Sequence, residues 1–248
     1  MDPTDFPENK DEVIEDLHRG GLRFIQRRGL FRFGMDSVLL AEFAKCKKGG
    51  KILDLCTGTG IVPVLLTART AAGRVTGLEI LPESAELARR NVSINGLEGI
   101  IDIITGDIRH IRQSLPGAAY DTVTANPPYI KARGGALNPD GAAAIARHEL
   151  LCGLNDVAGA AAYALKPHGR FYMVHKPHRL ADIIAELRLF KLEPKALRFV
   201  HPRAEKPPGL VLVEAVKNSN PGVAVLPPMI VYDENGAYTP EIGGIYRD

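Results

Sequence analysis

The sequence predicts an α/β fold in which a mostly parallel, seven-stranded sheet is covered by helices on both faces. From Lys51 onward, short apolar segments alternate with glycine-rich or proline-marked turns and helical patterns, an order typical of a parallel sheet. The last two apolar segments, 195–200 and 209–216, are joined by a loop too short for a helical crossover, so one strand is expected to be antiparallel. With 45% hydrophobic and 24% charged residues, a chain of 248 residues can bury a core of this size.

Three regions are expected along the chain. Residues 1–50 form an N-terminal lobe, in which an acidic stretch is followed by a basic one and by a helix at 36–46. Residues 51–218 form the main domain, and residues 219–248 form a tail in which Asn235-Gly236 predicts a hairpin. In the main domain, strands are expected at 51–56, 74–80, 100–105, 120–126, 170–176, 195–200 and 209–216, and helices at 61–70, 82–95, 148–165 and 177–190.

The helices of the main domain carry clear sequence signals. Pro63 and Pro82 stand in first helical turns, where a missing backbone N–H is tolerated. Two helices collect their apolar side chains on one side: Ala85, Leu87, Ala88 and Val92 in the helix at 82–95, and Leu180, Ile183, Ile184 and Leu187 in the helix at 177–190.

Charge and cysteine content narrow the function classes. The 31 Lys and Arg against 29 Asp and Glu leave a net charge of +2, so composition alone does not indicate a nucleic-acid-binding protein. The acidic N-terminus lacks a secretory signal pattern, and no apolar stretch approaches the roughly 20 residues of a membrane helix. Cys46, Cys56 and Cys152 are widely spaced and, with the histidines, show no metal-ligand spacing, so reduced thiols, no metal and a cytoplasmic location are expected.

A glycine-rich turn follows the first strand of the main domain. Asp54 lies at the end of that strand, and Gly58 and Gly60 open the next helix, where backbone N–H groups can approach a ligand. In an open α/β sheet, ligands bind at the carboxyl ends of the strands. A dinucleotide fingerprint would need a third glycine at the position of Pro63, so NAD and FAD are disfavoured.

Acidic residues follow the next two strands. Glu79 can accept two hydrogen bonds from a ribose diol, and Asp107 can accept one from an adenine amine. Together with Asp54 and the two glycines they predict a nucleoside pocket lined by carboxylates. Such a pocket suits a ligand without phosphate, for example a positively charged sulfonium nucleoside.

The fourth strand ends in Asn126-Pro127-Pro128-Tyr129, opposite the expected pocket. The prolines stiffen the backbone and leave the carbonyl of Pro127 to accept a hydrogen bond, and Asn126 adds a side-chain carbonyl. Two acceptors that hold a planar amine or amide favour a nitrogen whose lone pair points at an electrophile, while the ring of Tyr129 stacks under the substrate. We therefore interpret Asn126, Pro127 and Tyr129 as catalytic residues.

In this order, the segments DLCTGTG, GLEI, TGDI and ANPPY resemble the class I S-adenosylmethionine-dependent methyltransferases that act on an amino group, which have a Rossmann-like fold. The segments 29–43, 54–70, 146–149 and 232–246 are similar more narrowly to the bacterial tRNA(Val) adenine N6-methyltransferase-like group. The resemblance covers nearly the whole chain from about Gly20. It implies S-adenosyl-L-methionine as the cofactor, bound by Asp54, Gly58, Gly60, Glu79, Asp107 and Asn126, with Phe33, Gly34 and Asp36 helping to close over it.

The resemblance further implies RNA, and tRNA in particular, as the partner that carries the target adenine. Basic side chains flank the expected mouth and can neutralise phosphates. An unpaired base in an RNA loop costs little to extrude, and the sequence shows no module for opening duplex DNA, which favours RNA. The basic residues are Arg19, Arg23, Arg27, Arg28, Arg32, Lys131, Arg133, Lys176, Arg179, His201, Arg203 and Lys206.

Two other functions stay open. A protein-glutamine methyltransferase holds its amide in the same way and shares an isoleucine at the position of Ile130, although such enzymes usually carry a larger N-terminal helical domain. A non-catalytic nucleoside-binding or RNA-binding module could use the same fold, although the intact Asn126 argues against it. The oligomeric state is undetermined.

Overall fold

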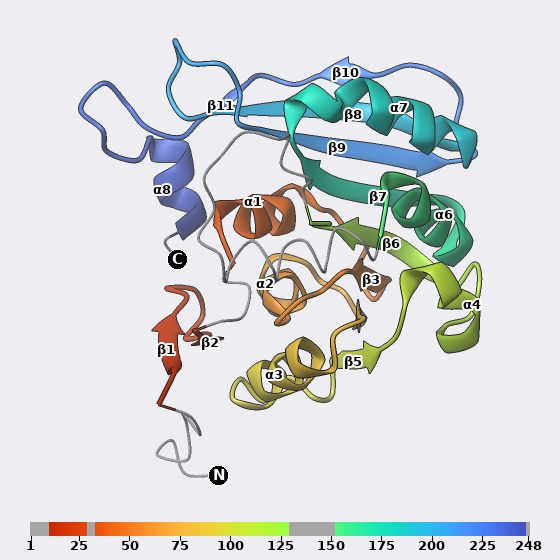
Figure 1. The fold of residues 1–248 in the computed structure, drawn as a ribbon. Coiled ribbons are helices and arrows are strands. Elements are labelled where there is room, and N and C mark those ends of the chain that lie inside the picture. Colours follow the sequence, from red (N-terminus) through yellow and green to blue (C-terminus); the bar gives the residue numbers. More distant parts are fainter. Residues whose placement is uncertain (1–9, 29–32, 129–151, 247–248) are drawn as a thin grey trace.

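The computed structural model describes residues 10–28, 33–128 and 152–246 (Figure 1). Its strands are β1 (Glu12–Asp16), β2 (Arg23–Arg27), β3 (Lys51–Leu55), β4 (Arg74–Glu79), β5 (Ile101–Thr105), β6 (Tyr120–Ala125), β7 (Leu165–His175), β8 (Leu192–His201), β9 (Leu210–Lys217), β10 (Ala224–Val225) and β11 (Met229–Ile230). Its helices are α1 (Met35–Phe43), α2 (Ile61–Arg69), α3 (Pro82–Ser93), α4 (Ile111–Ser114), α6 (Leu154–Ala164), α7 (Leu180–Leu189) and α8 (Pro240–Tyr246), with short 3-10 turns η2 (Ile108–His110) and η3 (Pro177–Arg179). Within these ranges no helix is long and apolar enough to cross a membrane.

The main sheet is mostly parallel with one reversed strand, as predicted. Its strand order is β10-β8-β9-β7-β6-β3-β4-β5, and the five strands from β7 to β5 in that order run parallel. β9 is antiparallel to both of its neighbours, β7 and β8, which confirms the single reversed strand. These seven strands form the continuous sheet. The two-residue strands β10 and β11 pair in parallel with the outer edge of β8 and were not predicted.

Helices cover both faces of the sheet, each face with its own apolar core. Successive residues of a strand point to opposite faces. On β7, Tyr172 and Val174 belong to the core under α1, α2 and α3, whereas Phe171 and Met173 belong to the core under α6 and α7. Burial on both faces explains why the central strands are almost continuously apolar.

Most predicted helices are present. The helices at 61–70, 82–95 and 177–190 correspond to α2, α3 and α7. The predicted apolar side of α3, from Ala85 to Val92, is buried. On α7, Ile183 and Leu187 are buried, and Leu180 and Ile184 are half-buried.

Several boundaries differ from the predictions; β8, for example, spans Leu192–His201 rather than 195–200, and α3 ends at Ser93 rather than at residue 95. α1 ends at Phe43 rather than at residue 46, because Ala44 is extended. Of the predicted helix at 148–165, residues 148–151 lie outside the described part, and α6 occupies Leu154–Ala164. Leu165 already belongs to β7, where the predicted turn at 166–169 is a bulge: the register with β6 shifts there, and His168 has a φ of 60°. The pairing of β7 with its neighbours outweighs the local turn signal.

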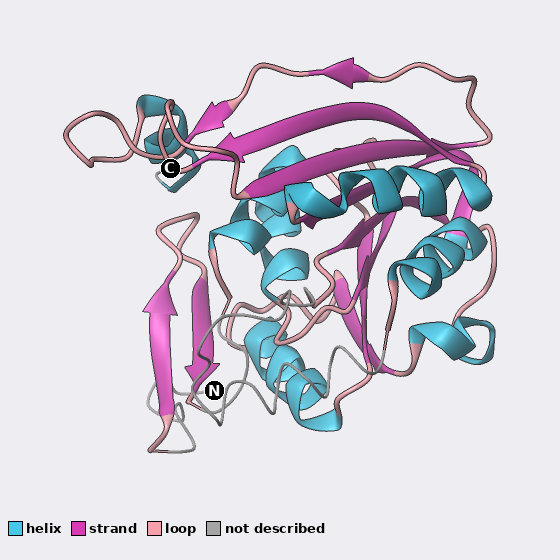
Figure 2. Ribbon diagram, turned by 45° about the horizontal axis from the view of Figure 1, so that its top comes forward, coloured by secondary structure: helices cyan, strands magenta, loops and turns pink. Residues whose placement is uncertain are grey.

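Residues 12–27 form a hairpin, β1–β2, that was not predicted and that lies apart from the main sheet (Figure 2). Two side chains of α3 hold it. The guanidinium of Arg90 donates to both carboxylate oxygens of Glu12 at 2.8 and 2.9 Å. The buried Asn91 accepts from the N–H of Ile25 at 2.6 Å and donates to the carbonyls of Ile25 and Thr59 at 3.1 and 3.0 Å. α3 therefore connects the hairpin to the glycine-rich turn.

Three stacked aromatic rings hold together the C-terminal residues 232–246. The Asn235-Gly236 turn is present, with a φ of 83° at Gly236, but the pairing around it is a single bridge between Tyr232 and Tyr238. The ring of Tyr238 stacks between those of Tyr232 and Tyr246, with centroid distances of 5.3 and 5.6 Å. α8, which the sequence did not predict, follows this turn and contributes Ile242 and Ile245 to the core beside α1.

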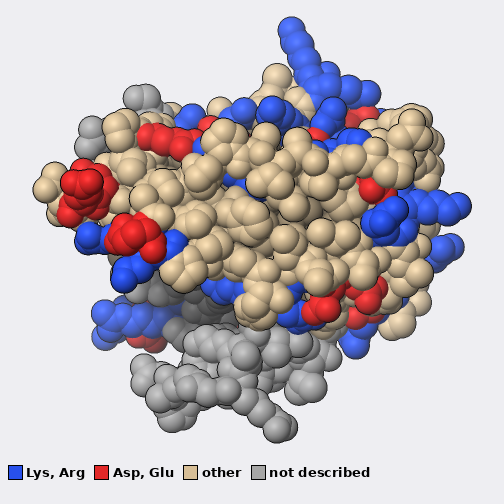
Figure 3. Space-filling model, turned by 90° about the horizontal axis from the view of Figure 1, so that it is seen from above, with Lys and Arg blue, Asp and Glu red and all other residues tan. Residues whose placement is uncertain are grey.

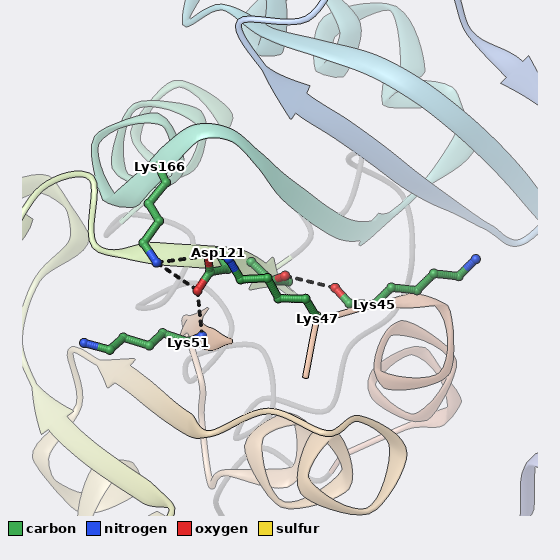
Figure 4. A network of polar contacts seen from close by, with 6 residues as sticks. Lys45, Lys47, Lys51, Asp121 and Lys166 are labelled. Carbon is green, nitrogen blue, oxygen red and sulfur yellow. Dashed lines mark hydrogen bonds and ion pairs between the residues drawn. The ribbon is translucent and has the colours of Figure 1, made fainter. Parts of the chain in front are cut away.

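A polar network joins the amino-terminal ends of β3, β6 and β7 (Figure 4). The carboxylate of Asp121 accepts from the backbone N–H of Lys51 at 2.9 Å and lies 2.9 Å from the ammonium groups of both Lys47 and Lys166. Burial acts to raise the pKa of Asp121, but these hydrogen bonds and cations outweigh it and lower the pKa to about 2. The network ties together the end of the sheet opposite to the expected site.

Candidate active site

The glycine-rich turn begins directly after β3. Cys56, Gly58 and Gly60 all have positive φ values, of 57°, 57° and 89°. A Cβ added at Gly58 would meet no heavy atom within 4 Å, so the space in front of this residue is open. A Cβ at Gly60 would lie 3.1 Å from the Cβ of Ala88, so this glycine also allows α2 and α3 to pack closely.

Asp54 lies at the end of β3 behind this turn and is only 1% exposed. Its two carboxylate oxygens accept hydrogen bonds from the hydroxyl groups of Thr57 and Thr124, both at 2.6 Å. Burial raises the pKa of Asp54 to about 7, against the lowering effect of the two hydroxyl groups. Asp54 therefore braces the turn from below, and it is not among the residues that line the neighbouring cavity.

Glu79, at the end of β4, is 2% exposed. One carboxylate oxygen accepts from the N–H of Gly58 at 2.8 Å, and the other accepts from the N–H of Leu81 at 2.9 Å. These bonds fix the carboxylate beside the glycine-rich turn. Because a carboxylate has about four acceptor positions, each oxygen can still accept from a ribose hydroxyl.

Asp107 follows β5 and caps the 3-10 turn η2. Its carboxylate accepts from the side chain of Arg109, at 2.5 Å for the closest pair of atoms, and from the backbone N–H of the same residue at 2.9 Å. The hydrogen bond from Arg109 lowers the pKa of Asp107. Asp107 is thus ionised at neutral pH, and it must share its acceptor positions with Arg109 if it binds an adenine amine.

A cavity that is open to solvent lies at the carboxyl ends of these strands. Glu79 and Asp107 give it an acidic part, and Ile80 and Ile108 give it apolar walls on which a flat ring can pack. Its remaining lining residues are Cys56, Leu78, Pro128 and Cys152. Gly58 and Gly60 are not among the lining residues, but the N–H of Gly58 donates to Glu79, which is one of them. A buried carboxylate beside apolar walls fits the adenosine part of S-adenosylmethionine.

Asn126 follows β6, next to the cavity residue Pro128. Its side-chain nitrogen donates to the hydroxyl of Ser37 at 2.9 Å, which makes the other end of the amide the acceptor. The N–H of Ser37 in turn donates to a carboxylate oxygen of Asp36 at 2.8 Å. Pro127 is buried, and Tyr129 lies outside the described residues.

The expected cofactor-closing segment contacts the β1–β2 hairpin. The ring of Phe33 meets that of Phe24 edge to face, with centroids 5.3 Å apart. Gly34 is the N-cap of α1, where an added Cβ would lie 3.1 Å from a carboxylate oxygen of Asp36. The structure therefore brings Asp36 to Asn126 through Ser37, but Phe33, Gly34 and Asp36 are not among the lining residues of the cavity.

Sequence reasoning missed several residues of this region. Ile80 and Ile108 could have been predicted, because each directly follows an acidic residue near a strand end. Ser37, Cys56 and Cys152 gave no local signal of a site. Within the described residues, no group of three or more His, Cys, Asp or Glu side chains is arranged to hold a metal ion.

Comparisons with known proteins bear on the family and the fold of this chain. A family model for the methyltransferase small domain matches residues 22–188. The chain is 31% identical over 221 residues to a tRNA1(Val) (adenine(37)-N6)-methyltransferase of Porphyromonas gingivalis, covering 85% of each chain. It is 28% identical over 190 residues to a protein of the same name from Phocaeicola vulgatus, covering 75% of this chain and 77% of the relative. A solved structure of a predicted O-methyltransferase from Agrobacterium tumefaciens has a TM-score of 0.70 at 24% identity, over 86% of this chain and 95% of the other, which is a likeness of fold.

Proposed function

Because this chain belongs to the methyltransferase small domain family, we propose that it transfers a methyl group from S-adenosylmethionine to the exocyclic amine of an adenine in tRNA. The observation that carries the proposal is that residues for the substrate amine and for the cofactor line the same cavity. Pro128, from the segment that holds the amine, lines the same cavity as Glu79 and Asp107, which are suited to the nucleoside of the cofactor. Donor and acceptor of the methyl group would thus meet at the carboxyl ends of β4, β5 and β6.

The cofactor, when bound, supplies an electrophilic methyl group on a sulfonium. The residues of this chain bind the cofactor and orient the adenine amine. Glu79 accepts from the ribose, and Asn126 and the carbonyl of Pro127 accept from the two N–H groups of the adenine amine, so that its lone pair is directed at the methyl group. Tyr129 stacks on the base. No strong general base is needed, because the methylated amine is acidic enough to lose its proton to water.

The choice of tRNA is supported by the relatives. Those that match most of this chain are named tRNA1(Val) (adenine(37)-N6)-methyltransferases, which names both the amine and its position. We place the reaction in the cytoplasm, where tRNA is modified. Protein glutamine offers a similar planar nitrogen, so the substrate needs a direct test.

The test offers labelled S-adenosylmethionine and the purified protein either unmodified tRNA(Val) or a release factor. Label is expected in the tRNA, as N6-methyladenosine after nucleoside mass analysis. Label found in the polypeptide alone would overturn the RNA assignment. Cofactor binding without label in either substrate would instead support a non-catalytic module.

The role of Asn126 is tested with Asn126→Ala. Loss of an acceptor used in the transition state should lower kcat by roughly 100-fold or more, with little change in cofactor affinity. Asn220→Ala, at an exposed position of the tail, is the matched control and should keep wild-type rates. Near-full turnover by Asn126→Ala would remove this side chain from the mechanism.

The role of Glu79 is tested by calorimetry. Glu79→Ala should weaken S-adenosylmethionine binding by on the order of 2–3 kcal/mol, because a charged acceptor of two hydrogen bonds is lost. Glu79→Gln, which keeps one acceptor, should weaken it less. The exposed Glu83 on α3 provides the control substitution Glu83→Ala. Unchanged affinity in Glu79→Ala would contradict the assignment.

A further inference from the structure

Two thiols face each other in the wall of the cofactor cavity. The sulfur atoms of Cys56 and Cys152 lie 3.8 Å apart, although the residues are 96 positions apart in the chain. Both residues line the cavity, together with Glu79 and Asp107. Cys56 comes from the glycine-rich turn after β3, and Cys152 lies just before α6.

The backbone at Cys56 makes this placement notable. Its φ of 57° lies in the left-handed region, which glycine adopts freely and which costs a residue with a Cβ on the order of 1 kcal/mol. Gly58, two residues later, has the same φ without that cost. A cysteine therefore occupies a position where glycine would be more stable, and its sulfur points at a second sulfur.

We propose that Cys56 and Cys152 form a reversible disulfide that controls access of S-adenosylmethionine to its cavity. A disulfide bond is about 2.05 Å long, so the two sulfur atoms would have to approach by roughly 1.7 Å from their present 3.8 Å separation. That movement draws the start of α6 toward the glycine-rich turn. It narrows the cavity between the residues that would hold the ribose and the adenine.

The oxidation needs a peroxide and balances as two steps. The thiolate of Cys152 attacks one oxygen of hydrogen peroxide, an S–O bond forms, the O–O bond breaks, and the departing hydroxide takes up a proton to become water. The sulfur of Cys56 then attacks the sulfur of Cys152, forming the S–S bond and breaking the S–O bond. The second hydroxide leaves with the proton of Cys56 as water. In sum, two thiols and one peroxide give a disulfide and two waters, and a dithiol reductant reverses the change.

The surroundings assign different roles to the two sulfurs. The hydrogen bond between the two sulfur atoms lowers the pKa of Cys152, against the raising effect of burial. The same contact, together with burial, raises the pKa of Cys56. Cys152 is therefore the group that reacts first with peroxide, and Cys56 is the resolving thiol.

Cys46 serves as an internal control. It lies beside Thr122, Lys47 and Asp121 at the opposite end of the sheet, and burial raises its pKa. A nonspecific oxidation would also reach Cys46, which is half-buried like the cavity pair. A specific switch leaves it as the single free thiol of the three cysteines.

The experiment compares reduced protein with protein treated with a small excess of hydrogen peroxide. Peptide mass mapping should find Cys56 linked to Cys152 and a free thiol at Cys46. Calorimetry should show S-adenosylmethionine affinity reduced roughly tenfold or more in the oxidised protein and restored by a dithiol. Cys46→Ser should behave as the wild type. In Cys152→Ser and Cys56→Gly, the ratio of affinities before and after peroxide should stay near one.

Each outcome bears on the inference separately from the proposed function. Binding by the reduced protein tests the proposed function, and the change on oxidation tests the switch. A disulfide that leaves affinity unchanged would overturn the control of binding. Absence of the Cys56–Cys152 link, or a link that involves Cys46, would overturn the pair itself.

Discussion

At the scale of single residues, the site depends on side chains that hold other side chains. Ser37 accepts from Asn126, and the hydroxyl groups of Thr57 and Thr124 hold Asp54 beneath the glycine-rich turn. These supporting residues are buried, so removing one leaves a polar partner without its hydrogen bond. One prediction concerns Asp54, which these hydroxyl groups hold, and another concerns Ser37.

Asp54 is expected to reduce stability at neutral and higher pH. Its pKa of about 7 lies above the usual value of 3.8, so between these pH values the folded protein binds more protons than the unfolded chain. The free energy of unfolding therefore falls as pH rises from 4 to 7 and stays lowered above pH 7. Asp54→Asn should be more stable than the wild type at pH 8 by about 1–3 kcal/mol, with a difference that shrinks toward pH 4. Urea denaturation across this range measures it, and a less stable variant at pH 8 would show that the threonine hydroxyl groups require the charged carboxylate.

Ser37 is expected to act as a positioning residue for Asn126. Ser37→Ala removes the acceptor that orients the amide and should lower kcat roughly tenfold, with KM for tRNA and cofactor affinity nearly unchanged. Ser37→Thr keeps the hydroxyl and should recover most of the rate. Steady-state kinetics separates kcat from KM, with Ser93→Ala on α3 as control. Equal losses in Ser37→Ala and Ser37→Thr would indicate a packing effect instead.

At the scale of elements, the two ends of the parallel strands have different tasks. The carboxyl ends of β3, β4, β5 and β6 lead to the residues of the candidate site, whereas the amino ends of β3, β6 and β7 meet at Asp121 (Figure 4). Parallel strands leave each end free of hairpin turns, so polar residues there must be satisfied by side chains and loops. The carboxylate of Asp121 satisfies polar groups at the ends of three strands, β3, β6 and β7.

Asp121→Asn is expected to lower stability by about 2 kcal/mol at pH 7. The pKa of Asp121, about 2, lies below the usual value of 3.8, so its contribution is complete above pH 4 and is lost as pH falls toward 2. The difference in free energy of unfolding between wild type and variant should therefore narrow between pH 4 and pH 3. The control is Asp102→Asn on β5, whose carboxylate is half exposed and 3.7 Å from Arg74, and which should change stability by about 0.5 kcal/mol or less. A constant difference at all pH values would contradict the role of the charge.

At the scale of the whole molecule, charge is spread rather than concentrated. On the face in Figure 3, Lys and Arg lie mostly around the edge and are interrupted by Asp and Glu, in keeping with a net charge of +2. The N-terminal hairpin presents Arg23 and Arg28 as exposed side chains and Arg27 as a half-buried one. α3 links this hairpin to the glycine-rich turn, so a substrate bound there lies near the candidate site.

Binding of tRNA is expected to weaken steeply with salt, because phosphate contacts release counterions. The double substitution Arg27→Glu and Arg28→Glu should raise KM for tRNA. It should also reduce the steepness of the slope of log affinity against log salt concentration by roughly one to two. Cofactor affinity should stay unchanged. Arg188→Glu on α7 is the control, and filter binding at several salt concentrations is the measurement. An unaltered slope would exclude the hairpin from the RNA-binding surface.

Local patterns predicted the chain order of β3 to β9 and of α1, α2, α3, α6 and α7, together with the reversed β9 and the acidic strand ends, because each depends on residues close together in sequence. The sequence also predicted that Glu79 and Asp107 line one cavity, because the carboxyl ends of neighbouring parallel strands lie at the same edge of the sheet. The roles assigned to these residues, and to Asn126, remain predictions.

Other features depend on contacts between distant residues. The β1–β2 hairpin is held by contacts with distant residues, such as Glu12 with Arg90 and Ile25 with Asn91. The strand start at Leu165 overrides a local turn signal, and α8 forms where residues 240–246 meet the core. Ser37 and Asn126 are 89 positions apart, and Cys56 and Cys152 are 96 apart. Local patterns report which face of an element is apolar and where it ends, but not which buried polar atoms of separate elements will pair. That choice follows from packing of the complete chain, where each buried donor must find an acceptor.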